Sequence, residues 1–214
     1  MPGPECLGPR EVGTPEEDAQ VAGYGAGVEY WDLRHAEDAE EDCKFDWLFE
    51  YAHLRSLLRN HIARDDAVLQ LGCGNSRLAQ EWCVDGHVGP LTNIDFSPGV
   101  VEQMLAEVRD GHGKAIQPYA NVFYDVADVR NLSDEEYPSE SFDAVLDKAT
   151  FDCIACNSEN HIADLEAMLR TAFRVLKKGG VYLLISCGDP QSRLPWLDEE
   201  PGLDWKVGRT PNHS

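Results

Sequence analysis

Four stretches of the sequence place glycines or charged residues directly after apolar runs, where ligands bind in parallel sheets. The apolar run 68–71 ends at Gly72 and Gly74, which one residue separates. The later runs end in side chains that accept or donate hydrogen bonds, namely Asp95, Asp128, Asp147 and Lys148. Because the carboxyl ends of parallel strands meet at one edge of a sheet, we expect these residues to form one site.

The glycine pair favours one class of nucleotide-like ligand. Glycines let the backbone turn sharply and approach a ligand closely, and the N–H groups that open the next helix favour a polar or negative group. A dinucleotide site requires a third glycine, but Arg77 stands there, and no Gly-Lys-Ser/Thr of a P-loop is present. A Gly-x-Gly with a polar follower fits S-adenosylmethionine. Taken by itself, the motif also fits a purely structural turn.

The carboxylates fit the nucleoside part of such a cofactor. Asp95 lies about twenty residues after the glycines, a spacing at which a carboxylate accepts both ribose hydroxyls. Phe96 is placed to lie against an adenine face, and Asp128 to accept from the adenine amino group. A plain aspartate at a strand end is the alternative for each residue singly, but four strand ends together favour a site.

Apolar periodicity predicts an α/β fold of the Rossmann-like, doubly wound type with a mostly parallel sheet. A flexible tail is predicted for 1–27, rich in Gly, Pro and acidic residues, followed by one domain over 28–214. Helices are predicted at 45–60, 78–86, 98–108 with Ser97 as N-cap, and 161–178 ended by a Gly-Gly pair. Strands are predicted at 68–71, 91–95, 122–124, 141–148 as the central strand, and 181–186. Residues 34–44 are expected to be an acidic loop.

Charge and cysteine content restrict the partners. The formal net charge of −21 argues against nucleic acid and anionic membranes, and fits a basic protein substrate, although solubility explains it equally well. Seven irregularly spaced cysteines predict reduced thiols in the cytoplasm. Cys153 and Cys156 form a C-x-x-C that we interpret as packing thiols, because a zinc site needs a second pair. No metal is expected.

Taken together, these motifs resemble the seven-β-strand S-adenosylmethionine-dependent methyltransferases, and among them the lysine methyltransferases of translation elongation factor 1A. The resemblance runs from Val28 to Ser186. Its most specific parts are Glu-Tyr-Trp-Asp-x-Arg at 29–34, Phe-Asp-Trp at 45–47, Leu-Gly-Cys-Gly-Asn-Ser at 71–76, Asp-Val-Arg-x-Leu at 128–132, Ser-Phe-Asp at 141–143 and Asp-Lys-x-Thr-x-Asp at 147–152.

The resemblance implies S-adenosylmethionine as cofactor and S-adenosylhomocysteine as product. It places cofactor contacts at Trp31, Trp47, Gly72, Asp95, Phe96, Asp128, Val129 and Lys148, and Gly74 joins them as the second turn glycine. The two tryptophans are expected to close over the cofactor. Where the family often has a cofactor-contacting tyrosine, this chain has His35, and the family's Lys-Gly-Thr reads Lys-Ala-Thr, a mild change.

The end of the sequence departs from the family pattern. The 28 residues after Ser186 contain four prolines, and residues 203–207 are the one candidate for a sixth strand. No seventh strand is predicted, so we expect either a shortened sheet, or a sequence that is a fragment, or another segment that covers this edge. Because an open edge strand can pair with another chain, we expect a monomer or an edge-paired dimer.

Methyl transfer requires the nucleophile and the methyl group in line at about 3–3.5 Å. We predict that Asp147, Thr150 and Asp152 orient an incoming lysine amine, with a helix N-terminal charge as the alternative for Asp152. A basic protein such as elongation factor 1A is the expected substrate. A small-molecule methyltransferase and a non-catalytic adaptor are the rival interpretations, and a protein N-terminus or a histidine stays open as acceptor.

Overall fold

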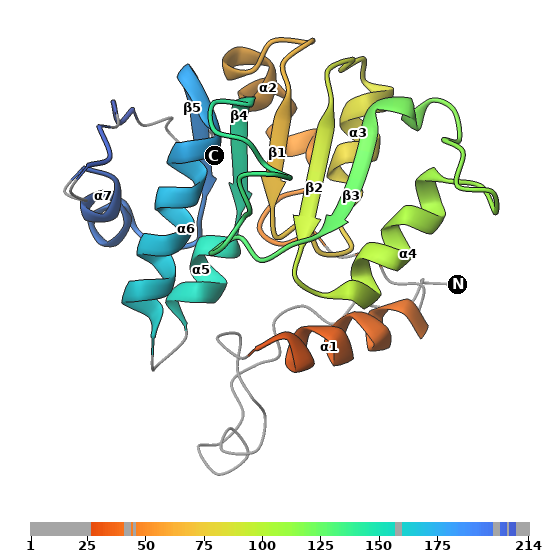
Figure 1. The fold of residues 1–214 in the computed structure, drawn as a ribbon, viewed down its shortest axis with the longest axis horizontal. Coiled ribbons are helices and arrows are strands. Elements are labelled where there is room, and N and C mark those ends of the chain that lie inside the picture. Colours follow the sequence, from red (N-terminus) through yellow and green to blue (C-terminus); the bar gives the residue numbers. More distant parts are fainter. Residues whose placement is uncertain are drawn as a thin grey trace.

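The fold is a five-stranded parallel sheet with helices on both faces (Figure 1). The computed structural model describes residues 27–40, 44, 46–156, 160–198, 202–204 and 206–208. The sheet order is β3-β2-β1-β4-β5. The strands are β1 (Val68–Leu71), β2 (Leu91–Asp95), β3 (Val122–Val126), β4 (Phe142–Lys148) and β5 (Leu176–Ile185). The helices are α1 (Val28–Glu40), α2 (Tyr51–His61), α3 (Leu78–Val84), α4 (Pro98–Val108), α5 (Thr150–Ala155), α6 (His161–Val175) and α7 (Pro190–Asp198), with a 3-10 turn at Tyr119–Asn121.

Alternating side chains of the strands divide the core into two layers. In β1, Val68 packs with α2, α3 and α4, whereas Leu69 and Leu71 point to the opposite face with α5 and α6. A strand directs successive side chains to opposite faces, and parallel strands with helices on both sides are apolar on both. This arrangement confirms the predicted doubly wound α/β fold.

The direction in which the chain adds strands to the sheet reverses at β1, and this reversal fixes where a ligand can bind. The chain winds from β1 to β2 and β3 on one side and then crosses back to β4 and β5 on the other. Open sheets bind ligands at the carboxyl ends of the strands beside such a switch point. Figure 1 shows α1 lying beyond this end of the sheet, so the first helix covers the place where a ligand would bind. Residues 141–148 were predicted to form the central strand of the sheet. This prediction was wrong, because β1 is central and β4 lies beside it.

The region before β1 differs from the prediction. Residues 34–40, expected to be a loop, continue α1, because Trp31 and His35 lie one turn apart on a buried face. The second helix begins at Tyr51 rather than at 45, and Phe45 lies outside the described residues. Leu48 has a left-handed φ of 68°, which interrupts a helix there.

The end of α6 also differs. The helix stops at Val175 instead of continuing to 178, because backbone N–H groups of Glu140 and Ser141 take the carbonyls of Arg174 and Val175. The chain then enters β5 at Leu176, five residues earlier than predicted. Phe142 of β4 pairs with Leu176 and Ala144 with Val181, so the register shifts between these two pairs and the extra residues lie in β5.

No sixth strand forms in residues 202–204 and 206–208, so the strand predicted for 203–207 is wrong for this described part, and Trp205 lies outside it. Leu203 instead packs as a single buried side chain against the α6 layer. The predicted tail, apart from Gly27, also lies outside the described residues. Within the described ranges, no helix has the length and apolar character needed to span a membrane.

Candidate functional site

A cavity of about 520 Å³ opens at the carboxyl ends of the strands, beneath α1. All nine side chains or glycines predicted to contact the cofactor line it: Trp31, Trp47, Gly72, Gly74, Asp95, Phe96, Asp128, Val129 and Lys148. Residues far apart in sequence therefore meet in one place. The volume lies within the range of small-molecule sites.

The glycine loop and Asp95 form the floor of the cavity. Gly72 and Gly74 both have left-handed φ values, 57° and 53°, which a residue with a Cβ adopts only under strain. A Cβ at Gly72 would also collide with the side chain of Thr150. The buried Asp95 carboxylate accepts from Gly74 N at 2.9 Å and Ser97 N at 3.0 Å, one bond to each oxygen. Each oxygen keeps a lone pair for a ligand hydroxyl, and burial raises the pKa of this carboxyl.

Aromatic side chains cover the cavity, and a buried lysine holds one of them. Trp31 and Trp47 meet edge to face with ring centroids 6.4 Å apart. Lys148 Nζ donates to Asp46 Oδ1 and to the Trp47 carbonyl, both at 3.1 Å, and Ser76 Oγ donates to the same Asp46 oxygen. Burial lowers the pKa of Lys148, and Asp46 opposes that shift. Through these hydrogen bonds Lys148 holds the backbone at Trp47 in place beside the ends of β1 and β4.

Two carboxylates in the cavity wall, those of Asp128 and Asp164, share the guanidinium of Arg130. Asp128 is held by Arg130, whose Nε lies 2.9 Å from Oδ1 and whose Nη2 lies 2.7 Å from Oδ2. Arg130 Nη1 also donates to Asp164 Oδ2 at 3.0 Å, which ties the loop after β3 to α6. Burial alone would raise the pKa of Asp128, but the bonds from Arg130 outweigh it, so the carboxyl stays ionised.

Of the three residues predicted to orient the acceptor, the cavity wall contains Thr150 and not Asp147 or Asp152. Thr150 Oγ1 donates to the Leu71 carbonyl at 2.8 Å. Asp147 is fully buried below the wall, where Oδ1 accepts from the N–H groups of Thr150 and Phe151 at 3.0 and 3.1 Å, and Oδ2 accepts from Tyr182 Oη at 2.9 Å. Asp147 therefore positions the start of α5, and its direct role toward a substrate stays a prediction.

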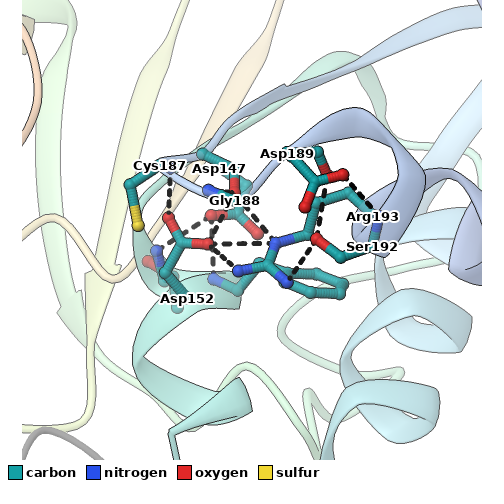
Figure 2. Close-up of polar contacts among 10 residues, drawn as sticks. Asp147, Asp152, Cys187, Gly188, Asp189, Ser192 and Arg193 are labelled. Carbon is teal, nitrogen blue, oxygen red and sulfur yellow. Dashed lines mark hydrogen bonds and ion pairs between the residues drawn. The ribbon is translucent and has the colours of Figure 1, made fainter.

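Asp152 belongs to a polar cluster at the end of β5 (Figure 2). Its Oδ1 accepts from Ser186 Oγ at 2.5 Å and Arg193 Nη2 at 2.8 Å, and Oδ2 accepts from Cys187 N at 2.9 Å. The Arg193 guanidinium also lies over the Phe151 ring, 5.2 Å from its centroid. These contacts join α5, which walls the cavity, to the β5–α7 connection.

We predict that a substitution which breaks this cluster lowers the free energy of unfolding, and that any loss of methyl transfer follows from this loss of stability. Asp152→Ala leaves a largely buried guanidinium without its partner, which costs about 3 kcal/mol in the free energy of unfolding. Urea unfolding measures the loss, and Arg193→Met should reproduce much of it. A variant Asp152→Asn that loses methyl transfer at unchanged stability would instead assign Asp152 a direct role.

Several residues in and around the cavity were not singled out from the sequence. Asp46 belonged only to an aromatic motif and Ser76 only to the glycine turn, yet the hydroxyl of Ser76, which lines the cavity, donates to the carboxylate of Asp46 behind it. Ala149, taken as a mild change, has a left-handed φ of 71° that costs about 1 kcal/mol for a non-glycine residue. Of the C-x-x-C pair, Cys153 lines the cavity and Cys156 is exposed. Within the described ranges, no group of three or more His, Cys, Asp or Glu is placed to hold a metal.

A parallel sheet with a switch point, a glycine loop after its first strand and a buried carboxylate at the end of its second are typical of domains that bind a nucleoside cofactor. Residues 62–203 match the family profile described as methyltransferase domain, so the chain belongs to the methyltransferase family. It is 30% identical over 209 residues to the mouse EEF1A lysine methyltransferase 4, covering 94% of this chain and 76% of the relative. It is 31% identical to the Pongo abelii citrate synthase-lysine N-methyltransferase CSKMT, mitochondrial, covering 83% and 76%.

A third relative is much longer. The human eEF1A lysine and N-terminal methyltransferase is 30% identical over 160 residues, which are 74% of this chain and 21% of that protein. Among solved structures, a putative S-adenosyl-L-methionine-dependent methyltransferase from Methanococcus maripaludis has a TM-score of 0.53 at 13% identity, covering 83% of this chain and 71% of that chain. This likeness supports the fold.

Proposed function

We propose that this chain binds S-adenosylmethionine in the cavity and transfers its methyl group to the amine of a lysine in a protein substrate. The observation that carries the proposal is the convergence of all nine predicted cofactor residues on one cavity at the switch point of the sheet. Membership of the methyltransferase family and relatives named as lysine methyltransferases support it.

The residues present fit this cofactor. The free lone pairs of Asp95 suit two ribose hydroxyls, and Phe96 and Val129 supply faces for an adenine ring. Asp128, oriented by Arg130, keeps acceptor capacity for the adenine amino group. When bound, the cofactor supplies a methyl group on a positively charged sulfur.

The chain's task toward the acceptor is to deliver a neutral amine to that methyl group. A free lysine has a pKa of about 10.4, so roughly one in a thousand is neutral near pH 7.4. Trp31 and Trp47 meet edge to face in the cavity wall, and an amine that leaves water to enter beside them has its pKa lowered by desolvation. Thr150 Oγ1 uses its proton on the Leu71 carbonyl, which leaves its lone pairs to accept from the amine.

We further propose elongation factor 1A as the first substrate to test. The name of the mouse relative specifies this protein, and the name of the Pongo abelii relative specifies citrate synthase, so a lysine acceptor is common to both. The net charge of −21 favours a basic protein over a nucleic acid or an anionic small molecule.

The test is methylation of purified elongation factor 1A with methyl-labelled S-adenosylmethionine, followed by mass spectrometry of its peptides. We expect label on a lysine side chain, and none when Asp95→Ala replaces the wild-type chain. Label on a histidine or the N-terminus would overturn the lysine assignment. If elongation factor 1A is unlabelled, the same assay on a cell extract separates another protein substrate from small-molecule products.

Two further proposals concern the cellular location and the oligomeric state of the chain. We propose a cytoplasmic location, supported by free thiols at Cys73, Cys83, Cys153, Cys156 and Cys187, and fractionation of cells tests it. We also propose that the chain is a monomer or a dimer paired through an edge strand. β3 and β5 form the two edges of the sheet, and an open edge strand can pair with a second copy of the chain. Light scattering of the purified chain distinguishes the monomer from the dimer.

A further inference from the structure

Asp46 lies behind the cavity wall and binds two of the residues that form it. Ser76, Trp47 and Lys148 line the cavity, whereas Asp46 itself does not. Its Oδ1 accepts from Lys148 Nζ at 3.1 Å and also from Ser76 Oγ. The side chain of Lys148 is only 4% exposed and that of Asp46 16%. A cation buried so deeply needs a paired carboxylate, and Asp46 supplies it.

The segment 46–49, which we call the Trp47 turn, has a backbone that its own sequence does not favour. Leu48 has a left-handed φ of 68°, which a residue with a Cβ adopts only under strain. The N–H of Phe49 donates to the Trp47 carbonyl at 2.8 Å, and Lys148 Nζ donates to the same carbonyl at 3.1 Å. Because a strained backbone persists only where surrounding contacts hold it, the Trp47 turn depends on Lys148 and, through it, on Asp46.

A single carboxylate thus connects the aromatic cover to the ends of two strands. Ser76 belongs to the glycine loop after β1, and Lys148 is the last residue of β4. The ring of Trp47 in turn meets that of Trp31 from α1. Burial lowers the pKa of Lys148 and Asp46 opposes that shift, so Asp46 favours the cationic form that makes the stronger hydrogen bonds.

A cover that is already closed strengthens the binding of a ligand beneath it. Ordering a loop when a ligand binds costs free energy, and a loop held in place beforehand avoids that cost. On the other side of the Trp47 turn, Lys44 pairs with Glu107 of α4. The segment therefore keeps one attachment when Asp46 is changed, and the effect of the change should be confined to the part beside the cavity.

We propose that Asp46 is a positioning residue for methyl transfer, which holds the Trp47 turn closed beside the cofactor through Lys148 and Ser76 without touching the cofactor itself. This role rests on the proposed function, because it needs the cofactor in this cavity. When Asp46 is absent, the turn opens more often and the cofactor leaves the cavity faster. Entry is not slowed, since the cofactor enters while the turn is open.

Binding kinetics of S-adenosylhomocysteine test the proposal. Asp46→Ala removes the charge and the acceptor, whereas Asp46→Asn keeps an oxygen that accepts from Ser76 and Lys148. We expect Asp46→Ala to weaken binding about 10-fold, the value of one hydrogen bond to a charged group, and Asp46→Asn about 3-fold. Stopped-flow measurement should show both losses in the dissociation rate constant, with the association rate constant unchanged.

Asp143→Asn is the matched control. It removes a carboxylate that pairs with another lysine, Lys177 at 2.8 Å, and it lies at the opposite end of β4, away from the cavity. Both rate constants should equal those of the wild-type chain. Thermal melting without ligand shows which variants are folded.

The outcomes separate this inference from the proposed function. Failure of the wild-type chain to bind S-adenosylhomocysteine would overturn both. Normal wild-type binding with an unchanged dissociation rate constant in a folded Asp46→Ala chain would overturn only the role of Asp46. A loss that lies in the association rate constant would also overturn it, because it would indicate a distorted cavity and not a loosened cover. If Asp46→Ala does not fold, the dissociation rate constant of Asp46→Asn decides in the same way.

Discussion

Replacing Asp95 by alanine should weaken S-adenosylhomocysteine binding by about 100-fold or more. The carboxylate is the proposed acceptor for two ribose hydroxyls, and each hydrogen bond to a charged group is worth about 1.5–3 kcal/mol. The same carboxylate accepts from Gly74 N and Ser97 N, so its removal also loosens the glycine loop that lines the cavity. Calorimetric titration of the wild-type chain and the variant measures the ratio of dissociation constants.

The matched control is Asp65→Ala, which removes an exposed aspartate from the turn between α2 and β1 and leaves the cavity intact. It should bind as the wild-type chain does. Since Asp95→Ala removes acceptors from two backbone groups, circular dichroism and thermal melting must show that it still folds. A folded Asp95→Ala chain with wild-type affinity would refute both the ribose contact and the location of the cofactor.

Asp147→Asn should change the dependence of stability on pH. Burial raises the pKa of Asp147 from 3.8 to about 7 in the folded chain, and its hydrogen bonds oppose that shift. Between pH 5 and 8 the unfolded chain is ionised throughout, whereas the folded chain passes from protonated to ionised. The folded state therefore binds the extra proton at pH 5, and this contribution to stability is lost as pH rises, by about 2.5 kcal/mol up to pH 8.

Asparagine removes this titration and keeps the contacts. Its oxygen accepts from Thr150 N and Phe151 N, and its amide donates to Tyr182 Oη. Urea unfolding at pH 5 and pH 8 should show the stability of Asp147→Asn relative to wild type rising by that amount. A constant difference between the two pH values would disprove the raised pKa of Asp147.

Asp143→Asn is the control on the same strand. Burial would raise the pKa of Asp143, but Lys177 and the Ala67 N–H outweigh it, so the pKa lies below its ordinary value. Asp143 is therefore ionised in both states above pH 5. Its stability difference from wild type should stay flat over the range in which that of Asp147→Asn changes.

The sequence by itself predicted several local elements and the nine residues that the fold brings together around one cavity. Strand β2 and helix α4 begin and end where predicted, because a short apolar run ended by Asp95 and an N-cap Ser97 followed by Pro98 are local signals. The cavity then followed from one global rule, that parallel strands bring their carboxyl ends together. Every predicted cofactor residue sits at or beside such an end or on the aromatic cover.

Only the tertiary structure decided which charged residues face the ligand and which hold the protein together. Asp147, Thr150 and Asp152 were predicted from the sequence to have one role, yet Thr150 lines the cavity, Asp147 accepts from the first N–H groups of α5 and Asp152 pairs with Arg193. The partners come from β5 and α7, about 35 to 40 residues away, and no local pattern encodes them.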